Sequence, residues 1–265
     1  MVNLFRAWFS RVKDQAAVLE QLKAPLEELP GGQDQWIQDS MDWFVEQFGR
    51  DVLERPIVLP SEFVPAEYDG SEVAARALFE QVRERMGVPP GRLVVRFDLD
   101  AVDGHLDRYR GRQAPQIAGA TRMRFGSWLP GKEYNTVFIS GRLLAEPSVL
   151  VANFAHEIGH EVLLGSGRVS VSRPDQESLT DLLVVFHGLG IFIANASFGR
   201  PPGGTNNLRM GMFYLRERAL TDALAYYAFL QGARTMPPWE DELDVPVRAG
   251  LAARLHKLEE SGTAR

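Results

Sequence analysis

Residues 147–165 read PSVLVANFAHEIGHEVLLG, the most informative segment of the chain. Pro147 suits the first turn of a helix, no proline follows before Gly165, and glycine commonly ends helices. In a helix of 3.6 residues per turn, His156 and His160 share one face, about 6 Å apart along the axis. Apolar residues cover much of the remaining circumference, which predicts a buried helix. A buried helix with two histidines and a glutamate on one side needs partners for them.

A metal ion would supply those partners. Two imidazoles at this spacing can both point at one Zn²⁺. Glu157 is rotated by about 100° from His156, near the metal without ligating it, where it can take a proton from metal-bound water. The chain has no cysteine and five histidines, so ligands for a transition metal must come from His, Asp and Glu. A catalytic zinc needs a third protein ligand and one open position.

The third ligand is expected from a second helix further along the chain. Ser172 is its expected N-cap, and Pro174 lies in its expected first turn. Glu177 follows His160 by 17 residues, which is enough for a short loop to bring it back to the metal. Asp181, four residues later on the same face, is placed to accept a hydrogen bond from the non-ligating nitrogen of a zinc-bound histidine.

Together the two motifs resemble those of the thermolysin-like zinc metallopeptidases, the gluzincins. In that family H-E-x-x-H is followed by a helix with a glutamate ligand and, four residues on, an aspartate that supports a histidine ligand. The resemblance implies that His156, His160 and Glu177 ligate zinc, that Glu157 is the general base, and that Asp181 supports a ligand.

The resemblance covers about residues 134–195 and implies a zincin-like fold. In the family, an edge strand of the sheet before the active-site helix pairs with extended substrate, and Tyr134–Ser140 stands in the corresponding place. The family also uses a His or Tyr to stabilise the tetrahedral oxyanion, and that role stays open here. The candidates are Tyr214, Tyr226, Tyr227, Arg209 and Arg216, each of which packing or surface charge also explains.

The hydrophobic pattern predicts an α+β fold, with helices first, then a small mixed or antiparallel sheet, then a mostly helical C-terminal half that contains the active-site helix. Helices are expected near 3–22, 34–53, 71–87, 147–164, 173–195, 211–232 and 245–260, and strands near 92–100, 120–125 and 135–140. Gly126 is expected in a turn. Residues 1–90 form a helical N-terminal region and 91–265 the zincin-like metal-binding catalytic region, compatible with one compact domain.

Other polar residues receive no functional role. His187 lies ten residues after Glu177, about 15 Å further along the expected helix and rotated by about 80°, so we expect a hydrogen-bonded core histidine. His105 and His256 have no assigned role. Asp98, Asp100 and Asp103 lack the rest of a calcium loop and predict a turn, and Gly203-Gly204 lacks the strand–turn–helix context of a phosphate loop.

Charge and hydropathy limit the partners. The chain has 35 acidic and 29 basic residues, a net charge of −6, which argues against nucleic acid and anionic membranes as partners. Charged residues interrupt the apolar residues of segment 1–20, unlike a signal peptide, and the longest apolar run, Leu182 to Ala194, is too short to span a bilayer. We therefore expect a cytoplasmic protein, whose oligomeric state the sequence leaves open.

The expected function is that of a zinc-dependent hydrolase, most simply a metallopeptidase acting on a peptide or protein. Glu157 would deprotonate the zinc-bound water and then protonate the leaving amine. One alternative is a non-catalytic zincin-fold binding or regulatory protein with an occluded metal site, for which Glu161 supplies a further carboxylate beside the expected ligands. Another is an enzyme that hydrolyses a non-peptide amide or ester.

Overall fold

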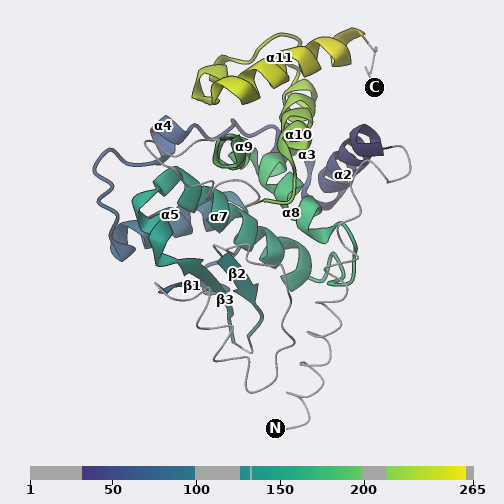
Figure 1. The fold of residues 1–265 in the computed structure, drawn as a ribbon. Coiled ribbons are helices and arrows are strands. Elements are labelled where there is room, and N and C mark those ends of the chain that lie inside the picture. Colours follow the sequence, from purple (N-terminus) through teal and green to yellow (C-terminus); the bar gives the residue numbers. More distant parts are fainter. Residues whose placement is uncertain (1–31, 99–125, 132, 199–212, 261–265) are drawn as a thin grey trace, which may run out of the picture.

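The computed structural model describes residues 32–98, 126–131, 133–198 and 213–260. Its architecture is mixed, mostly helical with one small sheet, as the α+β prediction requires (Figure 1). The strands are β1 Leu93–Asp98, β2 Gly126–Leu129 and β3 Asn135–Ser140. The helices before the sheet are α2 Gly32–Phe48, α3 Arg50–Leu53, α4 Pro60–Phe63 and α5 Glu72–Arg85. Those after it are η2 Gly141–Ala145, α7 Pro147–His160, η3 Glu161–Gly165, α8 Gln176–Val184, η4 Val185–Leu189, α9 Gly190–Phe198, α10 Glu217–Leu230, η5 Pro238–Glu242 and α11 Val245–Glu260.

The sheet is mixed, with the order β1-β3-β2. Strand β3 runs parallel to β1, with Leu93 opposite Asn135, and antiparallel to β2, with Gly126 opposite Ile139. The expectation that Tyr134–Ser140 is an edge strand is therefore wrong, because β3 is paired on both sides. Gly126 does not lie in a turn but begins β2, which forms one edge of the sheet. The strand expected at 120–125 lies outside the described residues.

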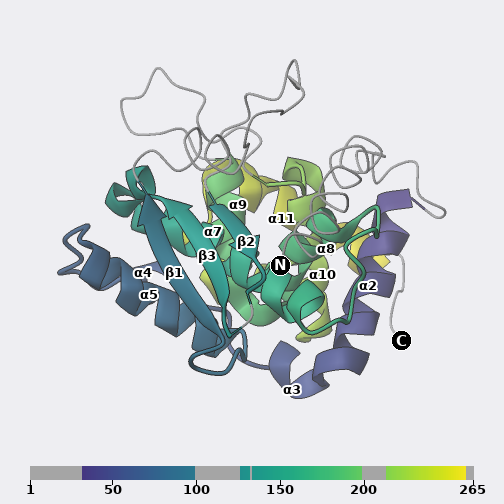
Figure 2. The same cartoon turned by 90° about the horizontal axis from the view of Figure 1, so that it is seen from below.

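Helix α7 is the central element of the molecule. It lies against β2 and β3, and α5 packs beside it against β1, so both helices cover the same face of the sheet (Figure 2). Helices α8 and α9 pack against α7, α10 packs against α9, and α11 against α10 (Figure 1). Every residue from Val149 to His160 is buried, which confirms the expectation of an enclosed helix.

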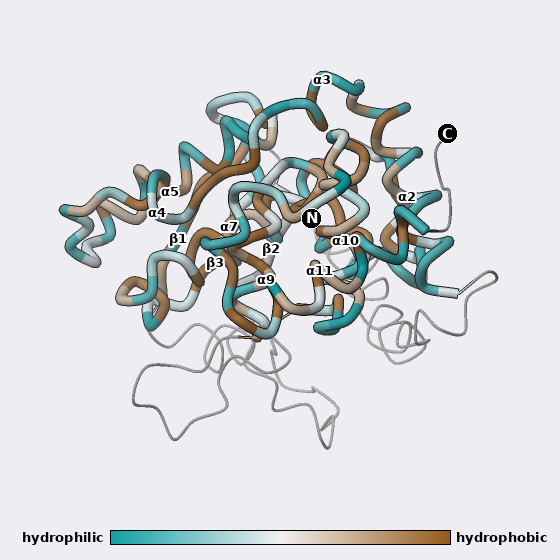
Figure 3. The backbone as a smooth tube through the Cα atoms, turned by 90° about the horizontal axis from the view of Figure 1, so that it is seen from above, coloured by the Kyte–Doolittle hydropathy of each residue, from teal (hydrophilic) through white to brown (hydrophobic). Residues whose placement is uncertain are grey.

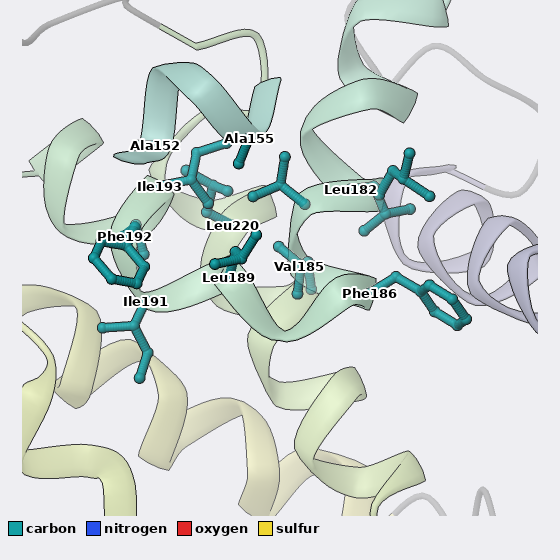
Figure 4. Close-up of a cluster of buried hydrophobic side chains, with 14 of the residues drawn as sticks. Ala152, Ala155, Leu182, Val185, Phe186, Leu189, Ile191, Phe192, Ile193 and Leu220 are labelled. Atoms are coloured by element: carbon teal, nitrogen blue, oxygen red, sulfur yellow. The ribbon is translucent and has the colours of Figure 1, made fainter. Parts of the chain in front are cut away.

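The hydrophobic core is continuous around α7 and α9. Hydrophobic stretches run through the interior of the molecule, whereas many turns at its periphery are hydrophilic (Figure 3), and α9 is buried over most of its length. In Figure 4 the small side chains of Ala152 and Ala155 allow Ile193 of α9 to approach α7 closely. The N-terminal helices share this core, because Phe44 of α2 contacts Phe186 with ring centroids 5.3 Å apart.

Two expected helices are interrupted by glycines with positive φ. The helix expected over 34–53 breaks at Gly49, whose φ is 91°. The helix expected over 173–195 turns at Gly188, whose φ is 79°; a Cβ there would lie 2.5 Å from Nη2 of Arg85. Ser172 is not the N-cap that we expected, because α8 begins later, after Asp175.

The segment from Gln176 to Phe198, formed by α8, η4 and α9, is long and apolar enough to cross a membrane. Within it, 94% of the most apolar window is buried by the rest of the protein. Such burial is typical of a core helix, because a lipid-facing helix presents its apolar side chains outward.

Candidate metal centre

Three side chains expected to act as ligands lie together where α7 faces α8. Oε2 of Glu177 is 3.3 Å from Nε2 of His156 and 3.4 Å from Nε2 of His160. The donor atoms of all three residues lie within 4.8 Å of one another, and the histidines are only 7% and 8% exposed. Two imidazole nitrogens and one carboxylate oxygen form the donor set of a catalytic zinc, which leaves a fourth position for water.

Asp181 orients the first histidine. Its Oδ1 lies 2.7 Å from Nδ1 of His156, and its Oδ2 accepts hydrogen bonds from the backbone N–H groups of Tyr214 at 2.6 Å and Leu215 at 2.8 Å. A carboxylate acceptor at Nδ1 places the proton there and leaves Nε2 directed at Glu177. The structure therefore places Asp181 where the sequence predicted it.

Thr180 is a neighbour of the second histidine that the sequence analysis missed. Its hydroxyl donates to the carbonyl oxygen of Gln176 at 2.8 Å, and its Oγ1 lies 3.5 Å from Nδ1 of His160. Since the hydroxyl proton is directed at Gln176, a lone pair is left for the imidazole N–H. The signal was its spacing, because Thr180 is three residues after Glu177 and thus on the same helix face.

The beginning of α8 is fixed by contacts with the N-terminal region. Asp175 accepts hydrogen bonds from Nε1 of Trp36 at 2.7 Å and from Nε of Arg173 at 2.6 Å. Burial opposes ionisation of Asp175, but the hydrogen bonds from Arg173 and Trp36 outweigh it and lower the pKa of the carboxyl. Glu177 lies two residues further on, so α2 contributes to the position of the third predicted ligand.

In the cluster of His156, His160 and Glu177, the carboxylate favours positive charge on the neighbouring imidazole rings. Burial disfavours a charged His156, but hydrogen bonds to Asp181 and Glu177 prevail and raise its pKa well above the ordinary value. Burial likewise disfavours a charged Glu177, but the attraction of His160 and His156 lowers its pKa. A divalent cation satisfies the same carboxylate without protonating the imidazoles, so the residues fit a zinc ion.

Glu157, the predicted general base, is buried and covered by strand β2. A Cβ built on Gly126 would lie 2.6 Å from Oε1 of Glu157. Only glycine therefore allows the β2 backbone to approach Glu157 this closely. Gly126 was missed as a site residue because an isolated glycine is typical of turns.

Glu161, the further carboxylate on this part of the chain, is turned toward the sheet. It accepts hydrogen bonds from Nε of Arg92 at 2.7 Å, from Nε1 of Trp128 at 2.9 Å and from Nδ2 of Asn135. In the part of the chain that the structure describes, the His-His-Glu group has no fourth His, Cys, Asp or Glu within its ligand distances.

The candidates for oxyanion stabilisation lie in different places. Tyr214 stacks on His156, with ring centroids 5.9 Å apart and planes 13° from parallel, and it is 42% exposed. Tyr226 lines a hollow between α2, α10 and α11, while the Tyr227 hydroxyl donates to the carbonyl of Arg55 at 3.4 Å. Among the described candidates, Tyr214 is therefore the one whose ring contacts a predicted ligand. Arg216 is exposed just before α10, and Arg209 lies outside the described residues.

His187 differs from the expectation of a hydrogen-bonded core histidine. It is 3% exposed, and neither ring nitrogen has a hydrogen-bond partner among the residues that the structure describes. Its ring contacts Phe48, with centroids 5.6 Å apart. Burial, together with the charges of Arg85 and Arg55, lowers its pKa to about 3. Its burial agrees with the expectation of a core histidine, whereas the expected hydrogen bond is not found among the described residues.

Several remaining residues add nothing to the site. His256, on the exposed side of α11, lies 3.3 Å from Glu260. His105, Asp100, Asp103 and Gly203-Gly204 lie outside the described residues.

Comparisons of the chain with protein-family models, with curated proteins and with solved structures find no match.

Proposed function

We propose that the chain is a zinc-dependent hydrolase with a zincin-like fold, most simply a cytoplasmic metallopeptidase. The observation that carries this proposal is the convergence of His156, His160 and Glu177 within 4.8 Å, on two neighbouring helices. Asp181 supports one histidine of this group, as the second motif of the gluzincin resemblance implies.

The residues divide the chemistry between them. His156, His160 and Glu177 would hold zinc, which when bound supplies Lewis-acid polarisation of a carbonyl and a water with a pKa near ~7. Glu157 takes the proton from the attacking water and passes it to the leaving amine. Asp181 keeps the Nδ1 proton of His156 in place, so that Nε2 remains free for the metal.

A peptide substrate is supported by the position of β2. Among the described strands, β2 pairs with β3 alone, and we propose that an extended substrate segment adds to its outer edge. The same strand lies against Glu157 at Gly126. An extended chain paired with β2 would therefore pass close to the predicted general base. A narrow, closed pocket in place of this edge would favour the alternative, a non-peptide amide or ester.

The non-catalytic alternative requires an occluded metal site. Glu161 is the residue that the sequence offered as an extra carboxylate, and its oxygens accept hydrogen bonds from three donors. Recruiting it to the metal would leave Asn135 and Trp128 without their acceptor, which costs about 1 to 3 kcal/mol for each buried donor. The geometry thus favours an open fourth position.

The test is metal analysis combined with a Glu157→Gln variant. We expect the purified wild type to carry one zinc per chain and to cleave members of a quenched fluorescent peptide library. Glu157→Gln keeps the zinc but loses about 10²- to 10⁴-fold in kcat, because the general base is gone. Glu46→Gln, an exposed glutamate on α2, is the matched control. A wild type without stoichiometric zinc, or full activity of Glu157→Gln, would falsify the proposal.

A further inference from the structure

We infer that Glu161 is a positioning residue that docks the β2–β3 hairpin, residues 126–140, onto the predicted metal-binding helix. It thereby sets where the edge of β2 lies relative to Glu157. This inference rests on the proposed function, and it assigns to Glu161 a role other than metal ligation.

The first support is the set of donors around Glu161. Its side chain is 5% exposed, and its carboxylate meets one residue from the region of each strand. Arg92 immediately precedes β1, Trp128 lies in β2, and Asn135 begins β3. A single carboxylate therefore ties the whole sheet to the end of α7, and hydrogen bonds to a charged acceptor are among the stronger ones.

Further contacts fix the Glu161 carboxylate and connect it to the rest of the β2–β3 hairpin. Oδ1 of Asn135 accepts a hydrogen bond from the N–H of Gly131, in the connection between β2 and β3, at 2.8 Å. Nη2 of Arg92 donates to the carbonyl of Gly165 at 3.3 Å. A Cβ on Gly165 would lie 2.5 Å from Oε2 of Glu161, so glycine is required there for the carboxylate to keep its place.

The helix itself changes at this residue. α7 ends at His160, and a π-helical turn runs from Glu161 to Gly165. π-helical turns are rare in proteins overall, but many of those that occur lie at functional sites. The extra residue in the turn changes the direction of the side chains that follow it.

The spacing of two contacts shows why the docking matters for the site. Strand β2 contacts Glu157 of α7 through Gly126, and it contacts Glu161, the first residue of the adjoining η3, through Trp128. Four residues of a helix advance about 6 Å, and two residues of a strand advance about 6.6 Å. The two contacts are therefore separated by nearly the same distance along the strand and along the helix. The hydrogen bond from Trp128 to Glu161 thus fixes the position of β2 over Glu157.

The test compares Glu161→Gln, Trp128→Phe and the control Glu46→Gln. Glu161→Gln keeps the volume but loses the charge that Arg92 pairs with, and Trp128→Phe keeps a smaller aromatic ring but loses the Nε1 donor. We expect Glu161→Gln to retain zinc and kcat while KM for the best library peptide rises about tenfold. Trp128→Phe shifts KM in the same direction by less, and because it leaves Glu161 in place it also serves if Glu161→Gln does not fold.

Two further readouts separate positioning from a general loss of structure. An N-acetyl-tripeptide hydroxamate should bind Glu161→Gln about tenfold more weakly, whereas acetohydroxamate, which reaches only the metal, should bind as it does to the wild type. Backbone amides of residues 126–140 should exchange faster with deuterium, with the global free energy of unfolding little changed.

The experiments distinguish a failure of the inference on Glu161 from a failure of the proposed function. Loss of zinc from Glu161→Gln would make Glu161 a ligand and overturn the inference. Unchanged KM, hydroxamate binding and amide exchange would overturn it as well. A wild type without zinc overturns the proposed function, while the exchange measurement still decides whether Glu161 docks the hairpin.

Discussion

Two regions of the core bury histidines to a similar depth but surround them differently. At the candidate metal centre, His156 and His160 are 7% and 8% exposed, and polar side chains of α8 face both nitrogens of each ring. At the bend between α8 and α9, His187 is 3% exposed, and within the described structure its two nitrogens have no hydrogen-bond partner.

The difference in polar contacts shows that burial of a histidine alone does not indicate a metal-binding site. The pKa of His156 is raised because the hydrogen bonds to Asp181 and Glu177 outweigh its burial. The pKa of His187 is lowered to about 3, because burial acts together with the nearby charges of Arg85 and Arg55. The surroundings of His156 favour a positive charge on the ring, whereas those of His187 keep its ring neutral.

The largest effect on zinc affinity is expected when the carboxylate of Asp181, which accepts the hydrogen bond from Nδ1 of His156, is replaced. Asp181→Asn places an amide N–H₂ or a weaker acceptor at Nδ1, which favours the wrong tautomer for metal binding at Nε2. We expect zinc affinity to fall about 10- to 100-fold, as is typical when a carboxylate behind a ligating histidine is lost. Competition with a fluorescent zinc chelator measures it, with Asp241→Asn on the exposed η5 as control. If Asp181→Asn and the wild type bound zinc with equal affinity, the polar contacts of His156 would not distinguish it functionally from His187.

The next effect is expected at His187, and it is a loss of stability that depends on pH. The unfolded chain protonates this histidine near pH 6.5 and the folded chain only near pH 3, so between these values the unfolded state binds more protons. The stability that neutral His187 contributes is complete above pH 6.5 and is lost as the pH falls. From pH 7 to pH 5 the loss amounts to about 2 kcal/mol.

His187→Leu should remove this dependence without affecting zinc binding. Urea unfolding at pH 7 and pH 5, in the presence of a chelator so that metal release does not contribute, compares the variant with the wild type. His256→Gln, at an exposed position, should keep the wild-type slope. The same slope in His187→Leu would mean that His187 titrates normally in the folded protein.

The smallest effect is expected from Thr180→Val, which keeps the shape of the side chain and removes its hydroxyl. The 3.5 Å separation from Nδ1 of His160 is long for a hydrogen bond, so we expect zinc affinity to fall only about two- to fivefold. The same chelator competition measures it. A loss larger than that of Asp181→Asn would show that Thr180, and not Asp181, is the main support of the centre.

The sequence predicted which residues lie together at the candidate metal centre, because these residues are at helical spacing on two segments. His156 and His160 are fixed by one turn of α7, and Glu177 and Asp181 by one turn of α8. Periodicity of this kind is local, so a single helix suffices to place both members of each pair.

What escaped prediction depends on contacts between distant segments. Gly126 lies in a strand because it pairs with Ile139 of β3, and its close approach to Glu157 brings together residues about thirty positions apart. Glu161 faces the sheet, where Arg92 and Trp128 donate to it. At the bend, Arg85 occupies the space that a Cβ on Gly188 would need. None of these contacts leaves a periodic signal in the sequence.

The hydrogen bond from Trp36 to Asp175 has a consequence for dissecting the chain. Residues 134–195 contain all three predicted ligands, yet the donor that fixes the start of α8 lies nearly a hundred residues upstream of that segment, on α2. The backbone donors that hold Asp181 lie beyond its other end, at Tyr214 and Leu215. An excised fragment spanning only the recognisable motifs would carry every predicted ligand and still lack the contacts that hold Asp175 and Asp181, so the smallest unit that preserves the centre includes these outlying donors.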